Sequence, residues 1–265
     1  MERGSPGVVI KKNELQAYFA HDSLDTAIKR DVRRFLGGIE RFFPHAGKAG
    51  LRWRIVKDQN WHSAWRRFFT PQKIGQGFWV TPPWLMPPKS RSRQVITIEP
   101  GMAFGTGTHA TTRGCMSFIE TVTRSFHGTA FTALDVGTGS GILAIALAKL
   151  GAKKIWALDN DPVAVKVARE NLEINDVESS IALSGKKLRE IRKMFPLVVA
   201  NLTAETIIDL AADLFRRVAP KGFLVLSGIL NSKAAGVIHR LAPDGFRVVR
   251  RRKEKEWTTL LLRRK

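Results

Sequence analysis

Three glycines and two acids form the most chemically informative pattern in the chain. Gly137, Gly139 and Gly141 lie at every second position, Asp135 precedes the first of them, and Asp159 ends the next apolar segment. A glycine turn lets a ligand approach the backbone closely, and an acid at the end of the following strand can accept hydrogen bonds from both ribose hydroxyls. The pattern predicts a bound nucleoside cofactor.

The spacing distinguishes between nucleoside cofactors. A dinucleotide fingerprint requires a third glycine where this chain has Ile142. Asp135 would repel a pyrophosphate but suits a cationic amino-acid group. S-adenosylmethionine carries an ammonium and a sulfonium and no phosphate, so we predict it as the cofactor, bound by Asp135, Gly137, Gly139 and Asp159. A nicotinamide oxidoreductase is the remote alternative.

Asn201 is a candidate for work at the transferred methyl group. It follows the apolar segment Leu197 to Ala200, and the loop after the fourth strand faces the methyl group in folds of this kind. Enzymes that methylate planar nitrogens have Asn-Pro-Pro and an aromatic residue here. Leu202 and Thr203 replace the prolines, and Ala204 replaces the aromatic residue, so the pattern argues against a planar nitrogen as acceptor.

His109 lies in a second glycine-rich loop, which contains Gly101, Gly105 and Gly107. A loop histidine can act as a general base, but it can equally be a hydrogen-bonded structural residue. A phosphate-binding loop would need a Lys after its last glycine, and Thr108 follows Gly107. We therefore keep His109 as a catalytic candidate and exclude a phosphate loop.

Alternating strands and helices must position these residues. The apolar patterns predict an α/β fold with a mainly parallel sheet, and an Asp161–Pro162 helix start. The expected parallel strands are Phe131 to Val136, Lys154 to Leu158, Ile181 to Leu183, Leu197 to Ala200 and Phe223 to Leu226. We expect a turn at Pro220 and Gly222, before the last of these strands. A final antiparallel pair, Phe246 to Arg250 and Trp257 to Leu262, is expected at the sheet edge. The expected helices are Arg113 to Thr123, Ile142 to Leu150 and Glu205 to Val218.

The chain divides on composition into a small α+β domain (1–80), a proline-rich linker (81–93) and an α/β domain (94–265). In the first domain we expect strands at Val8 to Ile10, Leu15 to Phe19, Leu51 to Val56 and Lys73 to Val80, with helices at Thr26 to Phe43 and Asn60 to Phe69. The second helix carries Trp61 and Trp65, and packing into the domain is favoured over a base-stacking platform.

Charge is the unusual feature of the composition. The 265 residues include 44 Lys and Arg against 23 Asp and Glu, a net charge of +21. Six basic residues lie within Arg247 to Lys255. A basic excess suggests affinity for a polyanion and hence proximity to ribosomal RNA; the alternative is a diffuse, solvated surface charge.

Other features point to a soluble, cytoplasmic protein. Cys115 is the only cysteine, which excludes an intramolecular disulfide and suits a reducing compartment. The amino terminus lacks the apolar core of a secretory signal, and no apolar run reaches the roughly 18 residues of a membrane helix. We expect no metal and a monomer.

Four segments, in this order and spacing, resemble the PrmA family of bacterial methyltransferases, which act on protein eleven of the large ribosomal subunit. They are EPGMAFGTGTHATT, LDVGTGSGILAIALAKLGAKKIWALDNDP, VVANLTAE and LSGIL. The resemblance covers about residues 7 to 262, and the glycine-rich loop before the helix is its most specific part.

The resemblance implies a Rossmann-like class I methyltransferase sheet of seven strands, the last antiparallel, after a small ferredoxin-like domain that captures the substrate. It implies S-adenosylmethionine binding at Phe104, Thr112, Gly137, Gly139, Asp159 and Asn201. It also implies methylation of lysine side chains and amino-terminal amines of a ribosomal protein.

Three departures from the family concern its substrate. First, the family's usual Asn-(Ile/Val)-Leu-Ala loop is NLTA here. Second, Gly7 to Val9 already matches the middle of the family's first domain, so we expect that domain to be shortened. Third, the chain is basic, whereas its relatives are usually acidic. The alternatives are a methyltransferase acting on RNA or on another basic protein, and a non-catalytic ribosome-binding relative.

Overall fold

The computed structural model describes residues 7–11, 14–18, 26–42, 50–54, 69–90, 92–100, 107–126 and 128–265. The chain divides into two compact units, Met1–Trp65 and Arg66–Lys265. None of the helices in these ranges combines the length and the apolar composition that a membrane crossing needs.

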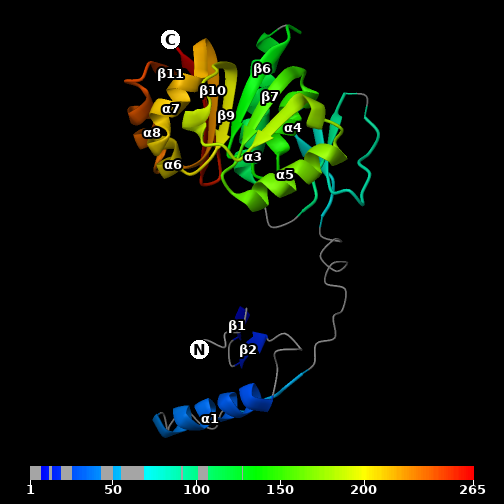
Figure 1. Ribbon diagram of the computed structural model, residues 1–265, viewed down its shortest axis with the longest axis vertical. Helices are drawn as coiled ribbons and strands as arrows, with labels where there is room; N and C mark the ends of the chain where they lie inside the picture. The colour runs from blue at the N-terminus through cyan, green and yellow to red at the C-terminus, as the bar shows by residue number, and fades with distance from the viewer. Residues whose placement is uncertain are drawn as a thin grey trace. The chain divides into compact units, whose positions relative to one another are not determined.

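The first unit contains a hairpin and one helix among its described residues (Figure 1). Strands β1 (Gly7–Lys11) and β2 (Glu14–Tyr18) pair antiparallel, and α1 spans Thr26–Phe42. These three elements confirm the predictions for this stretch. The strand predicted from Leu51 is wrong for residues 51–54, which are irregular, and residues 60–68 of the predicted tryptophan helix lie outside the described residues.

A seven-stranded sheet forms the centre of the second unit. Its order is β11-β12-β10-β9-β6-β7-β8, and β12 runs antiparallel to β10 and β11 while the other neighbouring pairs are parallel. The predicted final pair is confirmed, and β12 lies inside the sheet, leaving β11 as its edge. The strands are β6 (Phe131–Val136), β7 (Ala152–Leu158), β8 (Ile181–Ser184), β9 (Phe195–Asn201), β10 (Val218–Leu230), β11 (Phe246–Glu254) and β12 (Trp257–Arg264).

Helices cover both faces of this sheet, as Figure 1 shows. On one face, α3, α4 and α5 contribute to a core with every second residue of the strands, such as Ala133 and Leu197; on the other, α6, α7 and α8 pack on the alternate residues, such as Leu134 and Val198. This alternation is the period-two pattern of a strand buried on both sides. The helices are α3 (Ala110–Ser125), α4 (Ile142–Lys149), α5 (Pro162–Ile174), α6 (Ala204–Asp209), α7 (Ala211–Arg217) and α8 (Ala234–Leu241).

Two predictions in this unit need correction. The helix predicted from Glu205 to Val218 is two helices, because Leu210, with φ −88° and ψ 2°, ends α6 and starts α7. The break leaves Ile207 and Leu214 both in the core. The predicted turn at Pro220 and Gly222 lies inside β10, where the pairing with β9 shifts register between Val218 and Phe223.

The predicted strand from Lys73 to Val80 is also wrong, because it is a hairpin. Strands β3 (Gln72–Ile74) and β4 (Phe78–Thr81) are antiparallel and flank a turn in which Gly75 has a φ of +55°. The Glu120 carboxylate of α3 accepts hydrogen bonds from the turn amides of Gln76 (3.0 Å) and Gly77 (2.9 Å). Thus a residue of α3 that is distant in the sequence stabilises this turn.

The hairpin belongs to the second unit rather than to the first. Strand β5 (Gln94–Thr97) pairs parallel with β4, and Ile74, Phe78 and Ile96 are buried in the core formed with α3 and α4. Residues 81–93, predicted as a linker between domains, connect two strands of one small sheet. The division between units therefore falls at Trp65 and Arg66, earlier than predicted.

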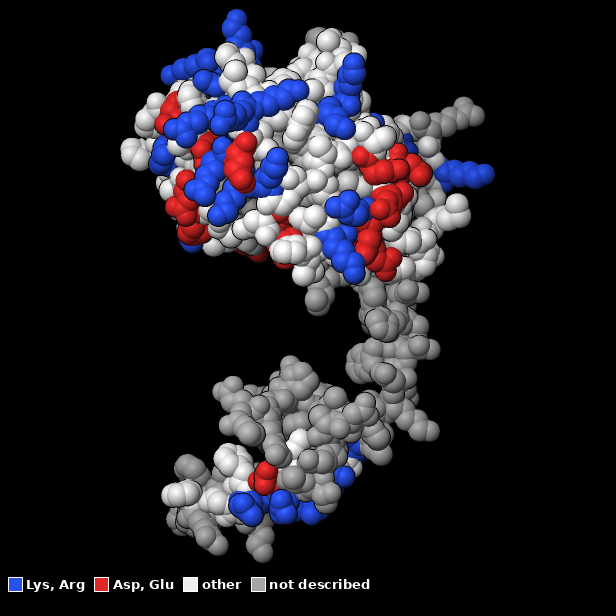
Figure 2. All heavy atoms as spheres, in the orientation of Figure 1, with Lys and Arg blue, Asp and Glu red and all other residues white. Residues whose placement is uncertain are grey.

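The positive charge is unevenly distributed over the surface. On the face seen in Figure 2, many Lys and Arg, with some Asp and Glu among them, lie over the part of the second unit where Figure 1 places β11, α7 and α8. Every residue of β11 from Arg247 to Lys253 is exposed. The edge strand is thus the most basic element of the sheet.

Candidate cofactor and active site

The glycine turn connects β6 to α4 at the carboxyl edge of the sheet. Gly137 has a φ of +72°, and its amide donates to the carbonyl of Leu158 (2.8 Å). A Cβ at this position would clash with the Leu202 side chain. The turn therefore requires glycine for its conformation and for the close approach of the loop after β9.

Asp159 lies beside this turn, at the end of β7, as predicted. Its carboxylate accepts hydrogen bonds from the amides of Gly139 (2.9 Å) and Asp161 (3.1 Å). Each carboxylate oxygen has a second lone pair, so both remain able to accept a hydrogen bond from a diol. Asp161 in turn caps α5 by accepting from Val163 (2.8 Å), and Pro162 occupies the first turn, which confirms the predicted helix start.

A cavity of about 360 Å³ opens next to Gly137 and Asp159. This volume lies within the range of small-molecule sites. Its walls are residues after the ends of β6, β7, β8 and β9 and residues of α6 and α7: Val136, Gly137, Leu158, Asp159, Asn160, Lys186, Lys187, Leu188, Arg189, Leu202, Thr206, Leu210 and Asp213. An acidic group at the wall of a largely apolar cavity suits a ribose with an attached base.

Asp135 lies below the turn, on β6, and is fully buried. Burial, together with the charge of Asp159, raises the pKa of its carboxyl to about 7, against the opposing hydrogen bond that Oδ2 accepts from Thr138 Oγ1 (2.7 Å). Oδ1 has no hydrogen-bond partner among the described residues, although the Ala144 amide also favours the charged form. A buried carboxyl with a free oxygen is a binding site for a cation.

Asn201 and Thr112 resemble Asp135 in having a buried oxygen without a partner. Asn201 Oδ1 and Thr112 Oγ1 form no hydrogen bond within the described ranges. Val136 pairs with Ala200, so Asp135 and Asn201 lie near the carboxyl ends of neighbouring strands. An unpaired buried polar group costs about 1–3 kcal/mol, so these oxygens mark places for a ligand.

Helix α3 closes this region from one face of the sheet. The Cys115 thiol, one turn after Thr111, hydrogen-bonds Ser227 and feels the charge of Asp135, and its burial raises the thiol pKa. A Cβ at Gly114 would clash with Thr259 of β12, so α3 and β12 are in close contact. Thr112 therefore lies in a helix turn that packs against β10 and β12.

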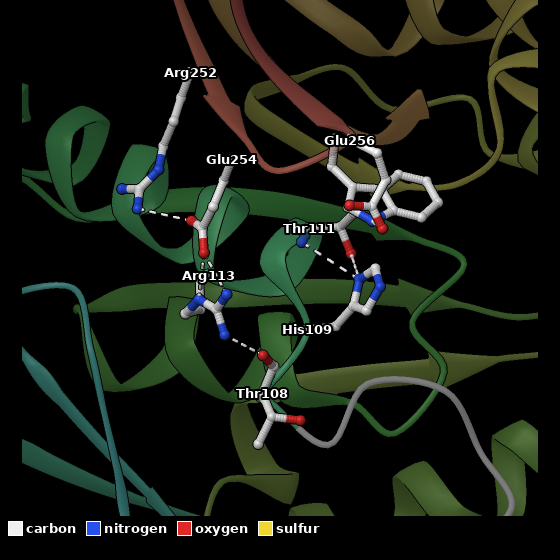
Figure 3. A network of polar contacts seen from close by, with 8 residues as sticks. Thr108, His109, Thr111, Arg113, Arg252, Glu254 and Glu256 are labelled. Carbon is white, nitrogen blue, oxygen red and sulfur yellow. Dashed lines mark hydrogen bonds and ion pairs between the residues drawn. The ribbon is translucent and has the colours of Figure 1, made fainter. Parts of the chain in front are cut away.

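His109 is the N-cap of α3, as Figure 3 shows. Its Nδ1 lies 2.8 Å from Thr111 Oγ1, and its ring meets that of Trp257 edge-on, with 5.1 Å between centroids. In the same network, Arg113 donates to Glu254 and to the carbonyl of Thr108. These contacts give His109 a structural role and do not place it at the wall of the cavity.

The predicted site residues are thus brought together in part. Gly137 and Asp159 share the cavity, Gly139 is bonded to Asp159, and Asp135 and Asn201 lie on adjoining strands. Phe104 lies outside the described residues. The described residues contain no cluster of three His, Cys, Asp or Glu side chains able to hold a metal ion.

Several cavity residues were not predicted from the sequence. Asn160 directly follows Asp159, and Leu188 lies in the loop after β8. The rule that ligands bind at the carboxyl ends of parallel strands could have indicated both. Leu202, in the loop that departs from the family pattern, forms part of the same wall.

Comparisons with known proteins agree on one family. The family described as "Ribosomal protein L11 methyltransferase (PrmA)" matches residues 3–265. A protein of that name from Geobacter metallireducens is 38% identical over 98% of this chain and 90% of its own length. Another from Citrifermentans bemidjiense is 41% identical over 92% of this chain and 79% of its own.

A solved structure gives the same result. The ribosomal protein L11 methylase from Lactobacillus delbrueckii subsp. bulgaricus matches with a TM-score of 0.68 and 33% identity, covering 74% of this chain and all of that one. The sheet order and the antiparallel β12 confirm the predicted class I methyltransferase fold, and S-adenosylmethionine is the cofactor that such a fold uses. The chain therefore belongs to the ribosomal protein L11 methyltransferase (PrmA) family.

Proposed function

We propose that the protein transfers methyl groups from S-adenosylmethionine to amino groups of ribosomal protein L11, on lysine side chains, the amino terminus or both. The observation that carries this proposal is the family match over residues 3–265, which includes the glycine turn and its acids. The choice of an amine as the acceptor rests on the resemblance of the sequence motifs to this family.

The described residues fit the cofactor. Asp159 would accept the ribose hydroxyls, and the backbone at Gly137 and Gly139 would allow close approach. Asp135 would hold the ammonium, since its unpaired Oδ1 is buried and a cation would favour its charged form. Thr112, and Phe104 by resemblance to the family, would complete the site from the loop and helix before the turn.

S-adenosylmethionine, when bound, supplies a methyl group activated by a sulfonium. The residues of this chain align the acceptor, and such alignment is the main source of catalysis in a direct transfer. Asn201 would accept a hydrogen bond from the substrate amine through its unpaired Oδ1. Burial lowers the pKa of an amine and so favours the neutral nucleophile; its proton passes to water.

The first unit, Met1–Trp65, is proposed as the substrate-binding part. The substrate amine belongs to a protein. A cavity of about 360 Å³ has the size of a small-molecule site, so a protein substrate needs a further binding surface outside it. We further propose that the enzyme is a monomer. We also propose that it acts in the cytoplasm, where its ribosomal substrate is made.

Two variants separate the roles of the acceptor and cofactor sites. Asn201→Ala should lower kcat for L11 methylation, measured at saturating cofactor, by about tenfold or more, because the amine loses its orienting partner. Asn160→Ala, a matched change at the cavity wall, should instead weaken cofactor binding and leave kcat at saturation close to normal. Tritium transfer and calorimetry measure the two quantities.

The same assay tests the proposed substrate. Tritiated cofactor is offered to purified L11 and, separately, to naked ribosomal RNA, and mass spectrometry of L11 peptides locates each methyl group. Label in RNA alone would refute the proposal in favour of an RNA methyltransferase. Full turnover by Asn201→Ala with normal cofactor affinity would refute the role given to Asn201, and absence of cofactor binding would indicate a non-catalytic relative.

A further inference from the structure

The exposed edge of the sheet carries a second set of unusual residues. Strand β11 pairs only with β12, so its other side is unpaired within the described sheet. Four of its basic residues, Arg247, Arg250, Arg251 and Lys253, are exposed, and we call them the arginine edge. Strand β11, which carries them, lies at one border of the second unit (Figure 1).

The arginine edge points to both sides of the sheet. Arg250 is opposite Leu261, which is buried on the α3 face, whereas Arg251 is opposite Leu260, which is buried on the α8 face. The register shifts between Val248 and Arg250, so Val249 is an extra residue and the strand bulges there. A ligand that lies along the strand would therefore meet cations above and below it.

No carboxylate of the described residues forms an ion pair with a residue of the arginine edge. Neighbouring Arg252 differs, because it donates to Glu254 Oε2 (2.9 Å), and Glu254 also pairs with Arg113. A row of unpaired cations repels itself, and this repulsion is relieved when anions bind.

Protection against edge-to-edge aggregation is the alternative explanation for a charged edge strand. One or two lysines, a proline or a bulge suffice for that purpose. The bulge at Val249 is already present, and four further cations on a chain of net charge +21 exceed the need. The excess favours a polyanionic partner.

The residue types indicate how that partner is contacted. Strand β11 has one aromatic residue, Phe246, which is buried in the core. Single-stranded nucleic acids are bound largely by stacking of bases on exposed aromatic rings, and β11 offers none. Double-stranded RNA is instead recognised by its shape and phosphates, which cations on an extended strand can contact.

We propose that the arginine edge docks the phosphate backbone of double-stranded RNA, without sequence preference. This rests on the proposed function, because a substrate that is a ribosomal protein is found next to RNA. The carboxyl end of β11 reaches Glu254, which pairs with Arg113 beside Thr108, as Figure 3 shows. RNA on this edge would lie next to the loop that enters α3 and would anchor the enzyme near its substrate.

The test measures RNA binding by the full chain without any methyl transfer. A fluorescein-labelled RNA duplex is titrated with wild-type protein at several salt concentrations, and anisotropy gives Kd. The edge variant Arg247→Gln/Arg250→Gln/Arg251→Gln should reduce the slope of log K against log salt by about 3, one for each lost phosphate contact. A variant with lysine at the same positions should retain most of the affinity.

The matched control is Lys153→Gln/Lys166→Gln/Arg169→Gln, which removes the same charge from β7 and α5. All three residues are exposed. This variant should keep the wild-type slope to within about one, because the contacts are local. Thermal unfolding of each variant shows that the fold is retained.

Three results would overturn the proposal. They are failure of the wild-type protein to bind the duplex, an equal loss of binding in edge and control variants, and equal competition by polyglutamate, which would assign the edge to an acidic protein. Methylation of isolated L11, measured in parallel, should be equal in the wild type and the edge variant. Loss of RNA binding with this activity intact therefore tests the edge alone, whereas absence of activity in all proteins tests the proposed function.

Discussion

Strands β6 and β11 belong to one sheet but offer opposite surroundings to a ligand. Asp135 of β6 is fully buried and its pKa is raised to about 7, whereas the residues of β11 from Arg247 to Lys253 are exposed and mostly unpaired. A ligand at β6 meets fixed, desolvated groups that select its shape and charge. A ligand at β11 meets exposed cations that select mainly for charge. The cofactor would therefore be recognised by shape and buried polar groups, and an RNA partner by its charge.

The comparison is tested most strongly at Asp159. Asp159→Ala should weaken S-adenosylmethionine binding on the order of 100-fold, because hydrogen bonds from two hydroxyls to a carboxylate are lost. Calorimetry measures the affinity. The arginine edge variant serves as the control and should bind the cofactor as the wild type does; a comparable loss in that variant would show that the two regions are not independent.

The packing of α3 on β12, the strand that separates β11 from the rest of the sheet, is tested at Gly114. Gly114→Ala places a methyl group against Thr259 and should lower the free energy of unfolding by about 1–3 kcal/mol. Gly236→Ala, in α8, meets nothing within 4 Å and should instead stabilise the protein by about 0.5–1 kcal/mol. Denaturant unfolding measures both; equal effects would mean that α3 is not tightly packed on β12.

The smallest predicted effect concerns pH at Asp135. A cation favours the charged carboxylate, so cofactor affinity should fall about tenfold from pH 8 to pH 6 as the carboxyl, with a pKa of about 7, becomes protonated. Asp135→Asn should bind weakly at every pH, with a flat profile. Calorimetry in two buffers of different ionisation enthalpy should show proton release only in the wild type.

The stability of the cofactor-free protein should change in the opposite direction. Because the pKa is raised from 3.8 to about 7 on folding, the contribution of Asp135 to stability is present below pH 3.8 and is lost as the pH rises through 7. Asp135→Asn should remove this part of the pH dependence. Unfolding midpoints of wild type and variant that stay parallel over this range would contradict the assignment.

The structural features that could be predicted from the sequence are those determined by neighbouring residues in the chain. Strand β6 begins and ends where its apolar run does, and Asp161 with Pro162 starts α5 by its own chemistry. The β3–β4 hairpin was not predicted because the acid that satisfies its turn, Glu120, comes from a distant helix. In the same way, Leu188 and Leu210 meet at the cavity only through packing of separate elements.

The order of the last two strands in the sheet was likewise not predicted, because it depends on packing between distant elements. Two apolar runs at residues 246–250 and 257–262 predicted an antiparallel pair, and alternation alone could not determine which strand would adjoin β10. Leu260, Leu261 and Leu262 of β12 are buried on both faces, whereas β11 has only Phe246 buried. Burial on both faces requires an interior place, so the apolar strand entered the sheet and the basic strand became its edge.

The interior place of β12 has a consequence for the order in which the site forms. The first turns of helix α3 pack against β12, where Gly114 contacts Thr259 and His109 contacts Trp257. During synthesis, α3 and the cofactor turn emerge from the ribosome well before β12 does. The start of α3 can settle over the cofactor only once the last strand of the sheet has been translated, so a nascent chain halted before β12 should have the glycine turn and lack a methyltransferase site.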